Sequence, residues 1–297
     1  MNLVQRDVDG RDYLALVTAL LQRARLADPD GGQWEAADFQ WWWRRDQHLE
    51  PSRATFWIDD RDTPVGAVVF TDWGDKWGCD VLTTPDNSTV APEALWDHVF
   101  ARMPSDPAKP VEIAARDDDA FTIALLAGVG FIGHDEVAVP CWMHAADRPA
   151  VATITDGYRL MSRATASASN RPHHMILRNG PAVADRLGEC SLYRPDLDLF
   201  VEAGSDGDAV VAAYGLFWAD PVTGVGLVEP MRTEDAHQNQ RLGKHVLTAG
   251  VDLLAAFGCT RIKVTYMEGN DASRRLYVNS GFQPQSPSRA YRLPVSH

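Results

Sequence analysis

The stretch from Val228 to Phe282 constrains the fold of this chain more than any other part of the sequence. Its apolar and polar residues are spaced as in a strand, a tight polar loop, a helix, a second strand and a second helix. The loop covers residues 238–243, and the helix that it opens is expected to end near Phe257 and Gly258. The second strand, residues 261–266, is rich in β-branched and aromatic side chains. This order of elements predicts an α/β domain.

The loop at 238–243 has the features of an anion-binding site. Consecutive backbone N–H groups at the start of a helix can hold an anion, and the helix dipole favours negative charge there. Arg241 and Lys244 add positive charge in a chain whose net charge is −13. The alternative is a solvated helix start with cationic side chains. The second helix is predicted to follow Asn270, a residue type that caps helices, and to be closed by Gly281.

Two motifs in this stretch resemble those of the GNAT superfamily of acetyl-CoA-dependent N-acetyltransferases. The first is a Gln/Arg-x-x-Gly-x-Gly/Ala loop, whose amides hold the pyrophosphate of coenzyme A in that family. Gln238 and Gly243 match it, but Arg241 stands where the first glycine is usual. The second, Asn-x-x-Ala/Ser-x-x-Leu-Tyr-x-x-x-Gly-Phe, is matched by Asn270, Ser273, Leu276, Tyr277, Gly281 and Phe282.

The resemblance implies an acetyl-CoA site in this part of the chain. The loop amides would bind pyrophosphate, and the strand before the loop would offer its backbone to the pantetheine amides. Arg274 would reach the adenosine phosphates, although a plain solvated helix face is an alternative for it. The expected cofactor-binding residues are Met231, Arg232, Thr233, Gln238, Asn239, Gln240, Arg241, Leu242, Gly243, Lys244, Asn270, Ser273 and Arg274.

Acetyl transfer to an amine also needs a base and an acid. Tyr277 matches the tyrosine that serves as the acid in the family, and a phenol stays protonated at neutral pH, so it can donate to a leaving thiolate. Glu229 lies on the strand near the position where several family members carry a base. It could instead be a solvated strand residue, or water could relay the proton. Glu234 and His237 lie nearer the loop and are expected to cap the helix or face solvent.

The two halves of the chain are weakly similar to each other. With Phe131 placed on Phe282, an offset of 151 residues, Gly130 meets Gly281 and Asp119 meets Asn270. We interpret this as an internal duplication, similar to the tandem GNAT arrangement of mycothiol synthase. The predicted fold is α/β (an α+β mixed sheet), with two tandem GNAT-like domains that are each a twisted mixed sheet flanked by helices. The expected boundaries are 1–144 for a degenerate first domain, 145–156 for a linker and 157–297 for the acetyl-CoA-binding domain.

The first half lacks the residues that would bind coenzyme A in the usual way. Its loop at the corresponding position, Thr84 to Pro92, has no glycine and no basic residue, and Asp86 would repel phosphate. Leu126 stands opposite Tyr277. We therefore expect this half to support the second domain and to form a wall of the acceptor cleft.

The amino-acid composition makes some classes of binding partner less favourable than others. With 45% hydrophobic and 23% charged residues the chain is expected to be globular, and its net charge of −13 disfavours nucleic acid or an anionic membrane as partner. It mildly favours a cationic acceptor, although acidity also serves solubility. The four cysteines form no CxxC pair and no disulfide framework, and the N-terminus has no apolar signal core, so we expect a cytoplasmic protein.

The acceptor site is the least defined by sequence. Residues 171–175, Arg-Pro-His-His-Met, stand where the variable first helices of the family contact the acceptor. His173 and His174 could ligate a metal, but no third ligand at a suitable spacing is evident, so no metal is expected. The tryptophans at 41–43, 73 and 77 would form either an aromatic acceptor site or hydrophobic core.

The predicted function is transfer of an acetyl group from acetyl-CoA to a small-molecule or peptide amine. The transfer would be direct, in a ternary complex, with the active site in the C-terminal domain. Two other functions stay open. One is a non-catalytic acyl-CoA-binding or regulatory protein with this fold. The other is a protein whose first domain binds and whose second domain modifies a protein partner.

Overall fold

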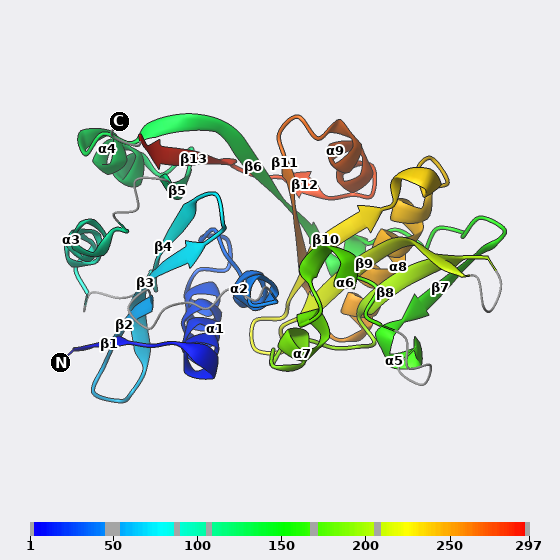
Figure 1. Ribbon diagram of the computed structural model, residues 1–297, viewed down its shortest axis with the longest axis horizontal. Coiled ribbons are helices and arrows are strands. Elements are labelled where there is room, and N and C mark those ends of the chain that lie inside the picture. Colours follow the sequence, from blue (N-terminus) through cyan, green and yellow to red (C-terminus); the bar gives the residue numbers. More distant parts are fainter. Residues whose placement is uncertain are drawn as a thin grey trace. The chain divides into compact units, whose positions relative to one another are not determined.

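The computed structural model describes residues 3–44, 54–85, 90–104, 109–166, 172–204 and 209–294. The chain folds into two compact units (Figure 1). Unit 1 comprises Met1–Phe39, Gln47–Ala138 and Ser286–His297, and unit 2 comprises Gln40–Asp46 and Val139–Gln285. Each unit contains a mixed β-sheet flanked by helices, so the predicted fold class is confirmed. No helix in the described ranges is long and apolar enough to cross a membrane.

Unit 1 is built on a sheet with the strand order β1-β2-β3-β4-β5-β13-β6. Its elements are β1 (Val4–Asp7), α1 (Gly10–Ala27), β2 (Ala54–Ile58), β3 (Pro64–Asp72), β4 (Trp77–Thr83), α3 (Pro92–Arg102), β5 (Val111–Arg116), α4 (Ala120–Gly128), the first part of β6 (Ile132–His144) and β13 (Ser288–Leu293). The helix α2 (Ala36–Trp42) begins in unit 1 and ends in unit 2. Apolar side chains of β3, β4 and β5 pack against those of α3 and α4 and form a core between the sheet and these helices, α3 and α4.

Unit 2 has the order β7-β8-β9-β10-β11-β6, and β12 also pairs with β6. Its elements are the second part of β6, η2 (Ala145–Asp147), β7 (Tyr158–Ser162), α5 (Arg163–Ala166), α6 (Ile176–Asn179), α7 (Val183–Gly188), β8 (Asp198–Ala203), β9 (Val210–Ala219), β10 (Val225–Thr233), η4 (Asp235–His237), α8 (Leu242–Ala256), β11 (Arg261–Met267), α9 (Asp271–Val278) and β12 (Gln283–Pro284).

Helix α8 packs closely on one face of the unit 2 sheet. A Cβ built on Gly250 would stand 2.1 Å from the ring of Phe217, so only glycine lets the helix approach β9 this closely. A Cβ on Gly215 would meet Val246 of the same helix at 2.9 Å. Because side chains alternate along a strand, the neighbours of Gly215 point to the other face of the sheet. That face carries the polar residues discussed below.

The two units share their local structure in the duplicated segments. Asp119 accepts the backbone N–H of Thr122 at 3.0 Å and caps α4, and Asn270 accepts that of Ser273 at 3.1 Å and caps α9. Beyond each helix a glycine with positive φ, Gly130 or Gly281, turns the chain. The similarity seen along the sequence therefore extends to the hydrogen bonds that start each helix.

The described structure departs from the sequence-based expectations in two places. The strand β13 was not foreseen; it joins unit 1 between β5 and β6, whereas residues 139–144 join unit 2. The units are thus not the sequential segments 1–144 and 157–297. Helix α7 ends at Gly188, and beyond it the backbone N–H of Leu192 donates to Gln40 Oε1 at 2.8 Å.

Candidate active site

The loop before α8 has two residues in the left-handed conformation. Asn239 has φ 63° and Arg241 has φ 60°. A left-handed backbone costs a residue with a side chain about 1–2 kcal/mol. The side chain of the N-cap residue, Arg241, makes no capping hydrogen bond to the backbone N–H groups in the first turn of α8. An uncapped helix start after an exposed loop in this conformation can hold an anion.

Arg241 explains why the loop keeps its shape without the usual glycine. Glycine is favoured where φ is positive. Arg241 adopts a positive φ at this position and acts as the N-cap residue of α8. The substitution therefore changes the side chain at this position while a positive φ is retained.

Gly243 brings three predicted site segments together. A Cβ built on it would stand 3.3 Å from Thr233 Oγ1 and 3.6 Å from Leu276 Cδ2. The first turn of α8, the end of β10 and the middle of α9 thus meet at one glycine. A side chain at position 243 would contact Thr233 and would block a ligand from the backbone at the start of α8.

Several predicted cofactor-binding residues have side chains that are buried or that contact a neighbouring residue. Leu242 is 1% exposed, so its side chain belongs to the core. The side chain of Gln238 donates to Asp235 Oδ1 at 3.2 Å. Arg232 donates through Nε to both carboxylate oxygens of Glu234 at 3.2 Å. By contrast, Asn239, Gln240, Arg241 and Lys244 are exposed.

Strands β10 and β11 separate at the middle of β10. Their parallel register runs from Val225 opposite Arg261 to Val228 opposite Val264, and the described residues beyond it show no further pairing between these strands. The register of β10 with β9 also shifts, between Val228 and Met231. Trp218 Nε1 donates to the carbonyl oxygen of Glu229 at 2.8 Å and holds the shifted backbone. Such a gap leaves backbone groups of β10 open to an extended ligand.

The charge of one predicted catalytic residue, Glu229, acts on the pKa of the other, Tyr277. Tyr277 is 5% exposed and packs edge-on against Phe282, with ring centroids 6.2 Å apart. Burial raises the pKa of Tyr277 well above its ordinary value, and the charge of Glu229 raises it further. The hydroxyl is therefore protonated at neutral pH, and a carboxylate lies within electrostatic reach of it. A hydrogen bond with Ser273 acts on the pKa of Tyr277 in the opposite direction.

The start of α9 is occupied by its own contacts. Asn270 caps the helix, as the sequence predicts, so its side-chain oxygen is already in use. Arg274 donates to Asp271 Oδ1 through Nε at 3.3 Å and through Nη2 at 3.2 Å. Arg274 is exposed and this ion pair is solvated, so the guanidinium can turn toward another anion at little cost.

A model of the acetyltransferase (GNAT) family matches residues 166–282. That range contains the uncapped loop, the gap between the strands and Tyr277. Residues 166–282 form a GNAT domain. None of the curated proteins compared with the chain matches it.

Solved structures with this fold span nearly the whole chain. A tandem GNAT protein from the clavulanic acid biosynthesis pathway, solved without acetyl-CoA, has a TM-score of 0.66 and 15% identity over 100% of this chain and 99% of its own. A GCN5-related N-acetyltransferase from Sphaerobacter thermophilus has a TM-score of 0.60 and 12% identity over 99% and 96%. A GNAT acetyltransferase from Colwellia psychrerythraea has 0.56 and 12% over 98% of each chain. The chain therefore has the tandem GNAT fold, which supports acyl transfer in general.

Outside the GNAT motifs, the structure assigns the tryptophans at 41 and 43 to packing. Both are buried. Trp43 Nε1 donates to Glu189 Oε2 at 2.7 Å, and the guanidinium of Arg44 lies 3.5 Å from the ring centre of Trp41. This favours the core interpretation over an aromatic acceptor site. Trp77 is also buried in a core, that of unit 1. Arg171 and residues 86–89 of the first-half loop lie outside the described residues.

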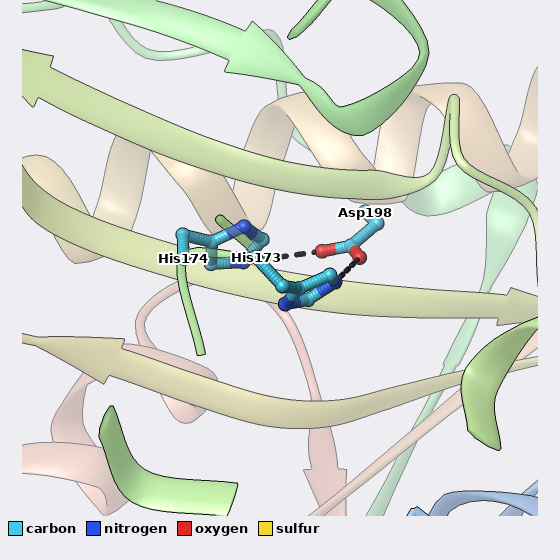
Figure 2. A group of neighbouring side chains, drawn as sticks. All are labelled: His173, His174 and Asp198. Atoms are coloured by element: carbon cyan, nitrogen blue, oxygen red, sulfur yellow. Dashed lines mark hydrogen bonds and ion pairs between the residues drawn. The ribbon is translucent and has the colours of Figure 1, made fainter. Parts of the chain in front are cut away.

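Sequence reasoning missed one cluster in the GNAT domain. His173 and His174 lie beside Asp198, and one possible ligand atom from each lies within 4.8 Å of the others (Figure 2). Asp198 starts β8, which is distant from the histidines along the chain but adjacent in the fold. The signal available in the sequence was a charged residue at the start of an apolar strand, which is rarely buried without partners.

Proposed function

We propose that unit 2 transfers an acetyl group from acetyl-CoA to an amine. The observation that carries the proposal is the buried hydroxyl of Tyr277 in the same unit as the point where β10 and β11 part, next to Glu229, whose charge adds to the rise in the pKa of Tyr277. A buried, protonated phenol beside an opening of this kind suits the departure of a thiolate. The uncapped start of α8 supports the same proposal, because coenzyme A carries a pyrophosphate.

The reaction requires two proton transfers besides the attack. The amine must lose a proton to a base, its nitrogen then attacks the thioester carbonyl carbon, and the carbon–sulfur bond breaks. Tyr277 is assigned to protonate the departing sulfur. Glu229 is assigned as a base, directly or through water, because its carboxylate lies within electrostatic reach of the Tyr277 hydroxyl.

Direct transfer is favoured over an acyl-enzyme by the state of the cysteines. All four are buried. Burial raises the pKa of Cys141 and of Cys190 to about 12, and that of Cys259 to about 11. Burial also raises the pKa of Cys79 well above its ordinary value. Since the thiolate is the nucleophile, these thiols are inert at neutral pH.

A screen of amine acceptors tests the proposal. The purified protein is incubated with acetyl-CoA and panels of small amines, amino sugars and peptides, and release of free coenzyme A thiol is recorded. Turnover that depends on the acceptor supports the proposal. If acetyl-CoA binds but no amine is turned over, the non-catalytic alternative takes its place. If acetyl-CoA does not bind, both fail.

A further inference from the structure

A buried polar cluster lies on the face of the unit 2 sheet that is opposite α8. The side chains of His174 and Asp198 are 2% and 0% exposed. The ring of His174 is stacked between that of His173, with centroids 4.6 Å apart, and that of Phe200, at 4.8 Å. Figure 2 shows the two imidazoles pointing at the two oxygens of the one carboxylate. Burying so many polar atoms is costly unless each finds a partner.

Hydrogen bonds fix the tautomer of His173. The backbone N–H of Met175 donates to His173 Nδ1 at 3.2 Å, so this nitrogen carries the lone pair. Nε2 therefore carries the proton and donates to Asp198 Oδ2 at 3.0 Å. The hydroxyl of Tyr193 donates to the same oxygen at 2.8 Å. Both ring nitrogens of His173 are thus occupied.

The remaining oxygen of Asp198 fixes the tautomer of His174. Nε2 of His174 lies 3.2 Å from Asp198 Oδ1, a distance at which the nitrogen must carry a proton because the carboxylate only accepts. The contact falls short of hydrogen-bond alignment, and neither atom has another partner among the described residues. Nδ1 of His174 is then a bare lone pair, also buried and without a partner there. Within the described part of the chain, this nitrogen is a strong acceptor with neither a hydrogen bond nor a close ionic contact.

The ionisation of the cluster agrees with this assignment. Burial acts to raise the pKa of Asp198, but the hydrogen bond from His173 and the close contact with His174 outweigh it, so that pKa lies well below its ordinary value. Burial lowers the pKa of His174, Asp198 opposes the shift, and His173 and Arg163 act with it. At neutral pH a neutral imidazole therefore faces an ionised carboxylate. In other enzymes, a buried carboxylate next to an imidazole holds a catalytic histidine in the tautomer that the reaction needs.

A metal ion fits the cluster less well, although three ligand types are present. A ligating imidazole nitrogen needs its lone pair. His173 Nε2 has none available while Met175 occupies Nδ1. The rings of His173 and His174 are also nearly parallel, at 22°, so their in-plane lone pairs do not converge on one point.

His173 and His174 line a cavity of about 620 Å³ in unit 2. The other lining residues come from the segment at α6, from β9 and from the residue after β10: Ile176, Leu177, Arg178, Val210, Val211, Tyr214 and Glu234. Tyr214 is paired with Arg232 across β9 and β10, so the cavity runs beside the strand residues assigned to pantetheine. Arg178 and Glu234 form an ion pair on the wall of this cavity, with 2.8 Å between Arg178 Nη2 and Glu234 Oε2.

We propose that this cavity takes the acceptor amine and that His174, held by Asp198, removes the first proton from its ammonium form, before Glu229 acts. The inference rests on the proposed function and adds a base that the GNAT motifs do not contain. The ammonium form of the acceptor gives one proton to His174 Nδ1. The amine then attacks the thioester carbon, the carbon–sulfur bond breaks, and the sulfur takes a proton from Tyr277. The nitrogen then gives its second proton to Glu229, Glu229 and His174 return their protons to solvent, and a proton relayed through water restores Tyr277, so one proton is released per turnover.

This role predicts a particular pH profile. The charged and titratable groups that face His174 are Asp198 on β8, His173 beside it, Arg163 on α5, and Tyr193 through Asp198. The ring centre of Tyr214 lies 5.4 Å from that of His174, and Arg178 and Glu234 line the same cavity. Because the pKa of His174 is lowered from 6.5, its basic form persists at neutral pH and is lost only on the acid side. The value of kcat/KM should therefore fall below pH 6.5.

The test compares His174→Asn with His173→Asn, using an amine from the acceptor screen. His174→Asn should lower kcat by a factor of about 10²–10⁴, as loss of a general base does. It should abolish the acid limb of the pH profile and leave the Kd of acetyl-CoA unchanged. His173→Asn removes a neighbour with no free lone pair, so it should retain the acid limb even if it lowers the Tm. Full turnover by His174→Asn, or an acid limb that survives in it, overturns the proposal.

Nuclear magnetic resonance on the wild-type protein gives a readout that does not depend on the folding of a variant. With ¹⁵N-labelled histidine, His174 should show a protonated Nε2 and a bare Nδ1. The Nδ1 resonance should move when the amine is added with coenzyme A. An Nδ1 signal unaffected by saturating amine, or one-to-one uptake of Zn²⁺ that His174→Asn abolishes, overturns the proposal. If no amine is turned over by the wild type, the proposed function fails. If turnover survives in His174→Asn, only this inference fails.

Discussion

Gly243 lies against Thr233, with only 3.3 Å between the threonine Oγ1 and the position that a Cβ on the glycine would take. The contact joins the first turn of α8 to the end of β10. A ligand that uses the amides of the one and the backbone of the other must pass this point. The residue at 243 therefore controls how closely a phosphate can approach the helix.

Gly243→Asp should weaken coenzyme A binding by about 100-fold, because a carboxylate near phosphate repels it by a few kcal/mol at the effective dielectric of a protein surface. Titration calorimetry with coenzyme A measures the change. Gly243→Asn is the matched control, since it adds nearly the same volume without charge. Equal weakening by both would assign the effect to size alone, and an unchanged Kd in the folded Asp variant would place the phosphates elsewhere.

One acetyl-CoA should bind per chain. Unit 1 also has a gap, where the pairing of β4 with β5 ends at Cys79 and Ile113, and a cavity of about 570 Å³ opens there. Its lining includes Asp28, Asp80 and Asp118. Burial raises the pKa of Asp80 to about 7, and a bound phosphate nearby would raise it further. Calorimetric titration should give a stoichiometry near one, and a value near two would refute this prediction.

Arg241→Gly should stabilise the protein by about 1 kcal/mol, because glycine adopts a positive φ without the steric cost that a side chain meets. The free energy of unfolding from urea denaturation measures this. Arg241→Ala keeps the steric cost and serves as the control. If Arg241 also contacts the cofactor, both variants should bind coenzyme A more weakly by a similar factor. A glycine variant less stable than the alanine variant would contradict the assigned backbone conformation.

The parts of the fold that sequence predicts well are those whose signals are local. The helix from Leu242, the strand from Arg261 and the cap at Asn270 each follow from a few adjacent residues, and each is found where it was expected. The strand β13 carries no such signal, because what decides its place is pairing with β5 and β6, which are far away along the chain. The composition of a linker cannot show that a strand from the C-terminal end of the chain joins the sheet of the first unit.

The candidate site likewise has residues that local sequence signals predict and residues that only the fold brings together. The loop and the tyrosine motif are contiguous, so their residues could be named from sequence. Asp198 could not be joined to His173 and His174, because α6, α7 and the turns around them separate these residues and only the fold brings them together. The backbone angle of Arg241 was also hidden, since an arginine gives no sequence signal for positive φ.

Tyr277→Phe is the most direct test of the proposed chemistry. The ring, its contact with Phe282 and helix α9 all remain, so folding and the Kd of acetyl-CoA should change little. General acid catalysis contributes about 10²–10⁴ in rate, and the coenzyme A thiolate is a tolerable leaving group unaided, so we expect the low end, roughly a hundredfold loss in kcat. The KM for acetyl-CoA should stay nearly constant, which places the loss in the chemical step.

The pH dependence of the wild type adds to this test. Since burial raises the pKa of Tyr277, its proton should be retained as pH rises through 10, and the acid should not be lost at the ordinary tyrosine value. Tyr13→Phe is the control, because Tyr13 is a buried tyrosine of unit 1 whose pKa burial also raises. It should leave kcat unchanged. Full acceptor-dependent turnover by Tyr277→Phe would reduce this tyrosine to core packing and leave protonation of the thiolate to water.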